Sequence, residues 1–215
     1  MTQMLLGIAP EWIPTLDNFV AGRNVELVAA LRHALAAEGE RGLYLWGETG
    51  SGKSHLLQAA IGHARAMGQS AIYASGEVPE AAQVVAVDAV ETLDDAAQIA
   101  LFALYNRQRE SGGMLLVSGT QAPAFLTLRD DLRTRLGWGL VYQVHALNDD
   151  EKAQALKQHA QARGFELPNE VTTYLLRHGR RDLPALLATL DALDEHCLRL
   201  KRVASVPLLK EVMRY

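Results

Sequence analysis

The hydrophobic pattern in roughly the first two thirds of the chain alternates between two kinds of segment. Short continuous apolar runs occur at 43–46, 84–87 and 114–117, and two further strands are expected at 70–74 and 140–144. Continuous runs are typical of strands that are covered on both faces. Between them, apolar residues recur at helical spacing over 27–37, 53–67 and 96–110. This alternation predicts an α/β fold with a parallel sheet flanked by helices.

The pattern changes after Asn148. Segments 149–163, 168–178, 182–200 and 206–215 all have helical spacing, and no strand pattern interrupts them. We therefore expect an α/β domain over residues 13–147 and a C-terminal all-helical domain over 148–215. Residues 1–12 form a separate N-terminal peptide in this division.

Composition narrows the functional classes only slightly. The chain has 215 residues, a formal net charge of −4 and 49% hydrophobic residues, so it can bury a core. The acidic balance argues weakly against a dedicated nucleic-acid-binding domain, which usually has a basic excess. Cys197 is the single cysteine, no apolar run approaches the roughly 18 residues of a membrane span, and the N-terminus lacks the basic residues of a signal peptide. We expect a cytoplasmic protein.

The strongest chemical signal is the stretch GETGSGKS, which follows the first predicted strand and opens a predicted helix. Glycines let backbone N–H groups approach phosphate oxygens, the lysine reaches the β- and γ-phosphates, and the last serine holds Mg²⁺. We predict that ADP or ATP binds here, with the contacts supplied by Gly47, Glu48, Thr49, Gly50, Ser51, Gly52, Lys53, Ser54 and His55.

A second Mg²⁺-binding group is expected at the end of another buried strand. Asp88 follows the run 84–87 and can hold the ion through water, together with Ser54. Many ATPases carry a second acid directly after this one to orient the attacking water, but here that position is Ala89. Glu91 lies two residues further on, and we interpret it as an exposed loop carboxylate rather than a catalytic group.

Several stretches together resemble the AAA+ domain of the replication initiator DnaA, and in particular the Hda group of DnaA-related proteins. The segment 15–23 resembles the opening of that domain, 47–57 its Walker A motif, 130–139 its box VII and 179–183 its sensor 2. The segments 104–112, 163–168 and 187–193 resemble the Hda group. The resemblance implies a nucleotide-binding base with a helical lid. It further implies that the helix-turn-helix domain following the lid in DnaA is missing here.

The resemblance also assigns roles to individual residues. Arg135 would be an arginine finger that reaches the nucleotide of a neighbouring protein, with Arg133 beside it as a structural or partner contact. Arg181 would be the sensor 2 residue, with Arg180 as the competing candidate. Sensor 1 would be Ser118 or Thr120, Phe19 and Val20 would lie against the adenine, and Trp138 is expected to pack rather than react.

The N-terminal peptide resembles the hexapeptide with which the Hda group binds the sliding clamp. Gln3 would bond at the rim of a groove while Met4, Leu6 and Ile8 enter pockets. The implied partners are DnaA, the β clamp of DNA polymerase III and, through the clamp, DNA. A homo-oligomer is also possible within this resemblance, and no membrane contact is expected.

The function implied is negative regulation of replication initiation by promoting hydrolysis of the ATP on DnaA. We do not expect the chain to be an efficient ATPase itself. Two other classes stay open at this stage: a self-sufficient P-loop ATPase or kinase, and a helicase-loader or transposase-partner protein of the DnaC or IstB kind. The seven histidines show no metal-binding spacing, so Mg²⁺ is the one metal expected.

Overall fold

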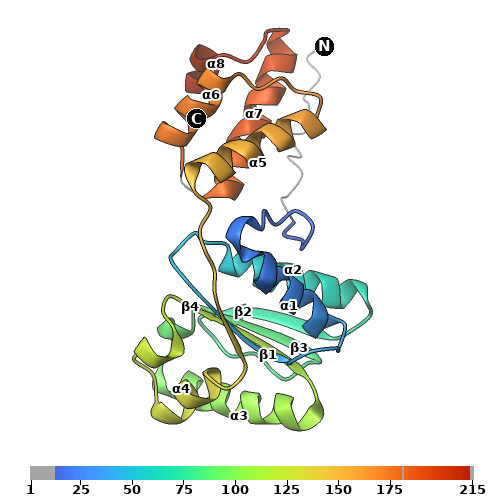
Figure 1. Ribbon diagram of the computed structural model, residues 1–215, viewed down its shortest axis with the longest axis vertical. Helices are drawn as coiled ribbons and strands as arrows, with labels where there is room; N and C mark the ends of the chain where they lie inside the picture. The colour runs from blue at the N-terminus through green and yellow to red at the C-terminus, as the bar shows by residue number, and fades with distance from the viewer. Residues whose placement is uncertain (1–12, 181, 214–215) are drawn as a thin grey trace, which may run out of the picture.

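The computed structural model describes residues 13–180 and 182–213, and a five-stranded sheet forms the centre of its first part (Figure 1). All strand pairs are parallel, in the order β2-β3-β4-β1-β5. The strands are β1 Gly42–Trp46, β2 Ala71–Ser75, β3 Val84–Asp88, β4 Met114–Gly119 and β5 Leu140–Gln143. Strands β3 and β4 are buried along their whole length, because helices cover both faces of the sheet.

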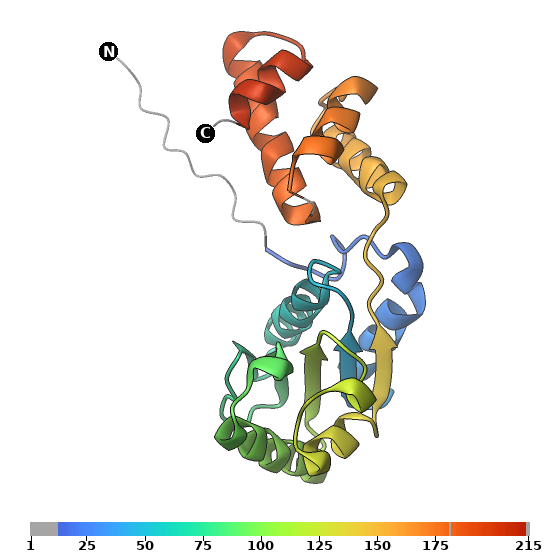
Figure 2. The same cartoon turned by 90° about the vertical axis from the view of Figure 1, so that its left-hand side faces the viewer.

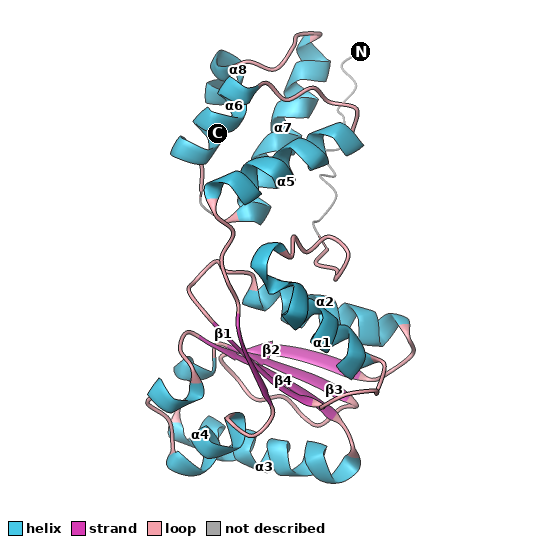
Figure 3. Cartoon of the chain, viewed as in Figure 1, coloured by secondary structure: helices cyan, strands magenta, loops and turns pink. Residues whose placement is uncertain are grey.

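Two pairs of helices sandwich this sheet (Figure 3). Helices α1 (Val25–Leu35) and α2 (Lys53–Ala66) pack on one face, and α3 (Asp95–Ser111) and α4 (Asp130–Leu136) on the other. Each face has its own apolar core, centred on leucines of α1 and α2 on one side and on Leu101, Leu104 and Leu132 on the other. Short 3-10 turns at Gly22–Asn24, Val90–Thr92 and Pro123–Phe125 complete this part.

The last third of the chain is helical and lies beyond the carboxyl ends of the strands (Figure 2). Its helices are α5 Asp149–Ala162, α6 Asn169–His178, α7 Leu183–Leu200 and α8 Val206–Val212. Helix α5 begins with a capping box, in which the Asn148 side chain accepts from the Glu151 N–H and the Glu151 carboxylate accepts from the Asn148 N–H. A separate core that includes Leu156, Leu175 and Leu190 holds the four helices together.

The predicted fold class is confirmed: the sheet is parallel, helices cover both faces, and a helical region follows it. Helix α4 is the element that the hydrophobic pattern did not reveal. With seven residues it is too short for a periodic signal, and only Leu132 and Leu136 are buried. Its ends carry the charges a helix dipole favours, Asp130 and Asp131 in the first turn and Arg133 and Arg135 in the last. In the described residues, no helix is long and apolar enough to cross a membrane.

Candidate functional site

The glycine-rich loop joins β1 to α2 at the carboxyl edge of the sheet, where open α/β sheets bind ligands. Gly52 is the N-cap of α2 and has a left-handed backbone with φ of 105°. A Cβ on Gly52 would lie 2.8 Å from Cε2 of Phe19. Glycine is therefore needed here twice, for the backbone turn and for the close approach of the Phe19 ring.

Lys53, the first residue of α2, is buried and points back into the loop. Its Nζ donates to the carbonyl oxygens of Gly47 at 2.7 Å and Glu48 at 2.9 Å. Burial lowers the pKa of Lys53, and the negative charges of Asp88 and Glu91 partly oppose that shift. An ammonium group that has lost part of its hydration gains from a phosphate partner, so this arrangement suits binding of an anion.

At the ends of β3 and β4, Asp88 contacts Ser118, one of the two sensor 1 candidates. The Ser118 hydroxyl donates a short hydrogen bond to Asp88 Oδ1, and Tyr73 on β2 donates to Asp88 Oδ2 at 2.8 Å. The Ala89 N–H lies 3.0 Å from Asp88 Oδ1, which accepts from it. Thr120 is exposed beyond the strand, so Ser118 is the sensor 1 candidate that contacts the acid.

Ala89, which stands where a second acid often occurs, has a left-handed backbone with φ of 57°. This turn starts the 3-10 segment that carries Glu91. The Glu91 side chain is exposed, as expected. Burial lowers the pKa of Lys53 and the charge of Glu91 partly opposes this, whereas burial raises the pKa of Tyr44 and the charge of Glu91 adds to that effect. The charge of Glu91 therefore acts on Lys53 of the phosphate loop.

A pocket between the glycine-rich loop and the helical region is lined by the residues that we expect near the base of a nucleotide. Its walls include Phe19 and Val20 together with Gly50, Ser51, Gly52 and His55 of the loop and α2. The helical region contributes Leu183 and Pro184 at the start of α7 and Lys152 of α5. The rest of the lining consists of Asn18, His145 and Leu147. An apolar slot beside a phosphate loop is suited to a base stacked between side chains.

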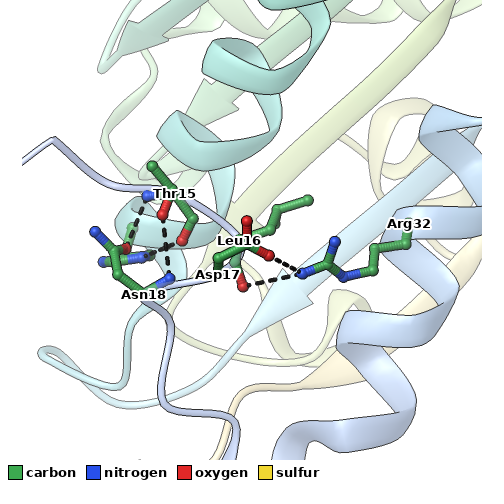
Figure 4. A network of polar contacts seen from close by, with 6 residues as sticks. Thr15, Leu16, Asp17, Asn18 and Arg32 are labelled. Atoms are coloured by element: carbon green, nitrogen blue, oxygen red, sulfur yellow. Dashed lines mark hydrogen bonds and ion pairs between the residues drawn. The ribbon is translucent and has the colours of Figure 1, made fainter.

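The segment before Phe19 is fixed in place by local hydrogen bonds (Figure 4). Thr15 and Asn18 exchange hydrogen bonds between their side chains and backbone N–H groups, at 2.8 and 3.1 Å. Arg32 of α1 pairs with Asp17 at 2.7 Å. His55 of α2 contacts the Thr15 carbonyl at 2.9 Å, so the glycine loop and the base-binding segment form one unit.

The linker from the sheet to the helical region is anchored at the same place. Buried Asn24 donates to the His145 carbonyl at 2.9 Å and accepts from the His145 N–H at 2.8 Å. Arg23 donates to the Ala146 carbonyl at 3.1 Å. A nucleotide held between Phe19 and Leu183 would thus touch both sides of the junction through which the helical region is attached.

Arg135 lies at the opposite edge of the sheet. It is in the last turn of α4, just before β5 begins, whereas the glycine loop follows the end of β1. A five-residue strand spans about 15 Å, so Arg135 is remote from the phosphate site of its own chain. Its guanidinium lies 3.9 Å from the centroid of Trp138 and 5.7 Å from that of Phe102.

The two acidic residues of α4 form ion pairs with arginines other than Arg135. Asp130 pairs with Arg133 at 2.7 Å, and Asp131 pairs with Arg129 at 3.1 Å. Within residues 13–180 and 182–213, no carboxylate lies within ion-pair distance of Arg135. The interpretation of Arg133 as a structural residue agrees with its ion pair, and Trp138 packs as expected, although its partners are guanidinium groups.

Two predicted sites lie outside the described residues. These are the peptide residues Gln3, Met4, Leu6 and Ile8, and the sensor 2 residue Arg181. The competing candidate Arg180 is described: its side chain is 82% exposed and pairs with Asp182 at 3.2 Å. Across the described residues, no cluster of three or more histidine, cysteine or acidic side chains has the geometry of a metal site.

Residues 149–213 match the family model described as "Hda, lid domain". This match coincides with helices α5–α8. The helical region of this chain is therefore similar to the lid domain of Hda. The resemblance to Hda and DnaA predicted from the sequence is thereby confirmed.

Solved structures show the same fold over most of this chain. Domain III of Thermotoga maritima DnaA is 20% identical with a TM-score of 0.75, covering 93% of this chain and 95% of that one. AMPPCP-bound DnaA from Aquifex aeolicus is 22% identical with a TM-score of 0.72, covering 87% and 69%. The Thermotoga maritima RuvB branch migration motor is 19% identical with a TM-score of 0.68, covering 94% and 71%.

Some residues of the candidate site were not singled out by the sequence. Tyr73 holds Asp88 from a neighbouring strand, and Leu183 and Pro184 close the base pocket from the lid. Nothing in the local sequence of a tyrosine on β2 indicates contact with an acid on β3. Pro184 does carry a signal, because a proline at the start of a helix fixes where that helix begins.

Proposed function

We propose that this protein binds ADP or ATP in the pocket beside Phe19 and promotes hydrolysis of ATP held by DnaA. Arg135 would act as an arginine finger in trans, while the N-terminal peptide, residues 3–8, tethers the protein to the DNA-loaded sliding clamp. The result is negative regulation of replication initiation. The observation that carries this proposal is Arg135, which has no described carboxylate partner and lies at the sheet edge remote from its own phosphate loop.

The chemistry asked of Arg135 is charge stabilisation. As the bond to the γ-phosphoryl group breaks, negative charge spreads over its oxygens, and a planar guanidinium donates two hydrogen bonds to them. Stacking on Trp138 leaves the N–H groups at the rim of the guanidinium available while fixing its plane. A finger supplied by a second protein can accelerate hydrolysis by about 10³ to 10⁵.

The protein's own nucleotide would have a different role. Phosphates would be held by Lys53 and the loop N–H groups, and the base by Phe19 and Val20 on one side and Leu183 on the other. Because the pocket has walls from both the sheet domain and the lid, bound nucleotide would set the angle of the lid. We therefore propose a nucleotide holder whose shape depends on its ligand, with little hydrolysis of its own.

The residues present fit a Mg²⁺ ion that accompanies the nucleotide. Ser54 has an exposed hydroxyl at the start of α2, and Asp88 supplies a carboxylate at the neighbouring strand end. Mg²⁺ favours oxygen ligands and retains several waters, so few protein groups suffice. When bound, the ion would neutralise charge on the phosphates. Ser54 would coordinate it, and Asp88 would orient its water.

Deletion of residues 1–8 tests the clamp tether. We expect the shortened protein to lose binding to the β clamp in a pull-down and to stop accelerating DnaA hydrolysis when clamp and DNA are present. A full-length variant with Gln3→Ala and Leu6→Ala should behave the same way, and Thr2→Ala serves as the matched control. Undiminished clamp binding by the deleted protein would rule the tether out.

Replacing Trp138 tests how Arg135 is positioned. A cation–π contact at an exposed site is worth about 0.5–1 kcal/mol, so Trp138→Ala should lower the maximal rate of stimulated hydrolysis by about 2- to 5-fold. Trp138→Phe should restore most of that rate, since it keeps an aromatic face. The midpoint of thermal unfolding should change little, because Trp138 is 54% exposed. Equal losses in both variants would mean that the ring does not position Arg135.

A further inference from the structure

A second cleft lies at the amino edge of the sheet, away from the nucleotide pocket. Its volume is about 440 Å³, and it is lined by the start of β1, the last turns of α3 and the turn before β5. Arg41 and Arg109 supply positive charge, and Tyr105 and Trp138 supply aromatic surface. None of these four residues has a part in the nucleotide site of this chain.

The two arginines of this cleft lack anionic partners among the described residues. Neither Arg41 nor Arg109 has a carboxylate within ion-pair distance, although nine such pairs involve other residues. Glu40 lines the cleft, but its Oε1 accepts from the N–H groups of Arg41 and Gly42 at 3.2 and 3.3 Å.

The Nε atom of Arg41 is buried, and no hydrogen-bond acceptor for it is found among the described residues. A buried donor without a partner is costly, and native proteins rarely leave one unsatisfied. An anionic group entering the cleft would neutralise the charge of Arg41 and offer an acceptor to its guanidinium group.

The cleft is continuous with the surroundings of Arg135. Trp138 stacks under the Arg135 guanidinium at 3.9 Å and also lies 5.5 Å from the Arg109 guanidinium. Tyr105 and Leu115 line both this cleft and the small cavity beside Arg135. A protein whose nucleotide meets Arg135 would therefore cover the cleft as well. Arginine and tryptophan at the centre of a surface are the residue types that contribute most to protein–protein affinity.

We propose that this cleft binds a carboxylate-bearing segment, an aspartate or glutamate side chain, of the protein whose ATP Arg135 contacts. This inference rests on the proposed function, because it assigns the docking site of the same partner. Arg41 and Arg109 would hold the partner, and Arg135 would act on its phosphate. The two roles can therefore be distinguished by kinetic measurements. Docking determines the protein concentration needed for half-maximal stimulation, and the arginine finger determines the maximal rate of hydrolysis.

Full-length protein with Arg41→Ala or Arg109→Ala tests this assignment in the DnaA hydrolysis assay with clamp and DNA. Each variant should need about tenfold more protein for half-maximal stimulation, with the maximal rate unchanged within twofold. Arg41→Glu should be worse than Arg41→Ala, and Arg41→Lys should recover part of the affinity because it retains the charge. Raising the salt concentration from about 0.05 to about 0.3 M should narrow the gap between wild type and variants, since ion pairs are screened.

Arg107→Ala is the matched control, because Arg107 is exposed on the same helix as Arg109 and does not line the cleft. It should behave like the wild type. An unchanged half-maximal concentration in both Arg41→Ala and Arg109→Ala would overturn the proposal, as would a loss of equal size in Arg107→Ala. Loss of self-association instead of partner binding would also overturn it, assigning the cleft to a second copy of this chain.

A direct binding measurement keeps this test separate from the proposed function. Partner capture by immobilised wild type, Arg41→Glu and Arg107→Ala is compared without following hydrolysis. If the wild type captures DnaA but does not accelerate its hydrolysis, the finger mechanism fails while the capture ratio still decides the cleft. Capture reduced about tenfold by Arg41→Glu alone supports the cleft, and equal capture by all three proteins rejects it.

Discussion

Replacing Arg135 by alanine is expected to abolish the acceleration of ATP hydrolysis on DnaA, a loss of about 10³-fold or more at saturating protein. Its guanidinium, 3.9 Å from Trp138, has no carboxylate partner in the described residues, so its charge is available to a ligand from outside. The measurement is turnover of ATP bound to DnaA, with clamp and DNA present. Arg135→Lys should recover little, because an ammonium group retains the charge but loses the planar fork.

Arg133→Ala is the matched control for this change. Arg133 lies two residues away on α4 and pairs with Asp130 at 2.7 Å, with both side chains partly or largely exposed. Exposed ion pairs of this kind contribute little to stability, so the variant should stimulate hydrolysis nearly as well as the wild type. Full stimulation by Arg135→Ala would refute the finger mechanism, and equal losses in both variants would point to damage to α4 rather than to lost catalysis.

The sequence predicted the strands and long helices well because their signals are local. Continuous apolar runs such as Val84–Val87 can be read without knowing what covers them, and α3 and α7 are long enough for several helical turns to repeat. Helix α4 was missed because seven residues give two buried leucines and no repeat. The order of the strands in the sheet was also not predicted, because an apolar run does not indicate which strands lie next to it.

In the candidate site, too, local motifs were predicted and contacts between distant segments were not. The phosphate loop was predicted because spacing and residue type define its chemistry, and Asp88 was predicted because it follows a buried strand. Its hydrogen bond with Ser118 was not predicted, and it arises because two strand ends meet at one edge of the sheet. Contacts between distant segments were not predictable. Tyr73 on β2 donates to Asp88 on the adjacent strand β3, and Asn24 holds the linker at His145. No single stretch of sequence records which of these side chains will meet.

The surroundings of Arg135 are the clearest example of information that only the fold supplies. In the sequence, Arg135 lies close to Asp130 and Asp131, which makes a surface ion pair the simple alternative to a finger. In the structure Arg133 and Arg129 take those two acids. Arg135 instead stacks on Trp138, which also lies against Arg109. The alternative is thereby weakened by geometry, while the role of Arg135 on a partner's phosphate stays a prediction.

Lys53→Met is expected to weaken binding of ADP to this protein by about 100-fold, since charged hydrogen bonds contribute roughly 1.5–3 kcal/mol each. Lys53 Nζ is buried within the phosphate loop, 2.7 Å from the Gly47 carbonyl oxygen. A phosphate bound there would interact with the positive charge of Lys53 with little screening by water. Methionine keeps the length and the apolar stem, so the loop should stay folded. Titration of ADP by calorimetry at neutral pH measures the change.

The consequence for regulation follows from where the nucleotide pocket lies. Because Phe19 and Leu183 line it from the sheet domain and the lid, an empty pocket removes the contact that would fix the lid, and stimulation of DnaA hydrolysis by Lys53→Met should fall in step with nucleotide occupancy. Saturating ADP should restore it. Lys157→Met, on α5 and outside the pocket, is the matched control and should bind ADP normally. If Lys53→Met loses ADP yet stimulates DnaA fully, the nucleotide does not set the shape of the partner face, and Arg135 is presented by the sheet domain alone.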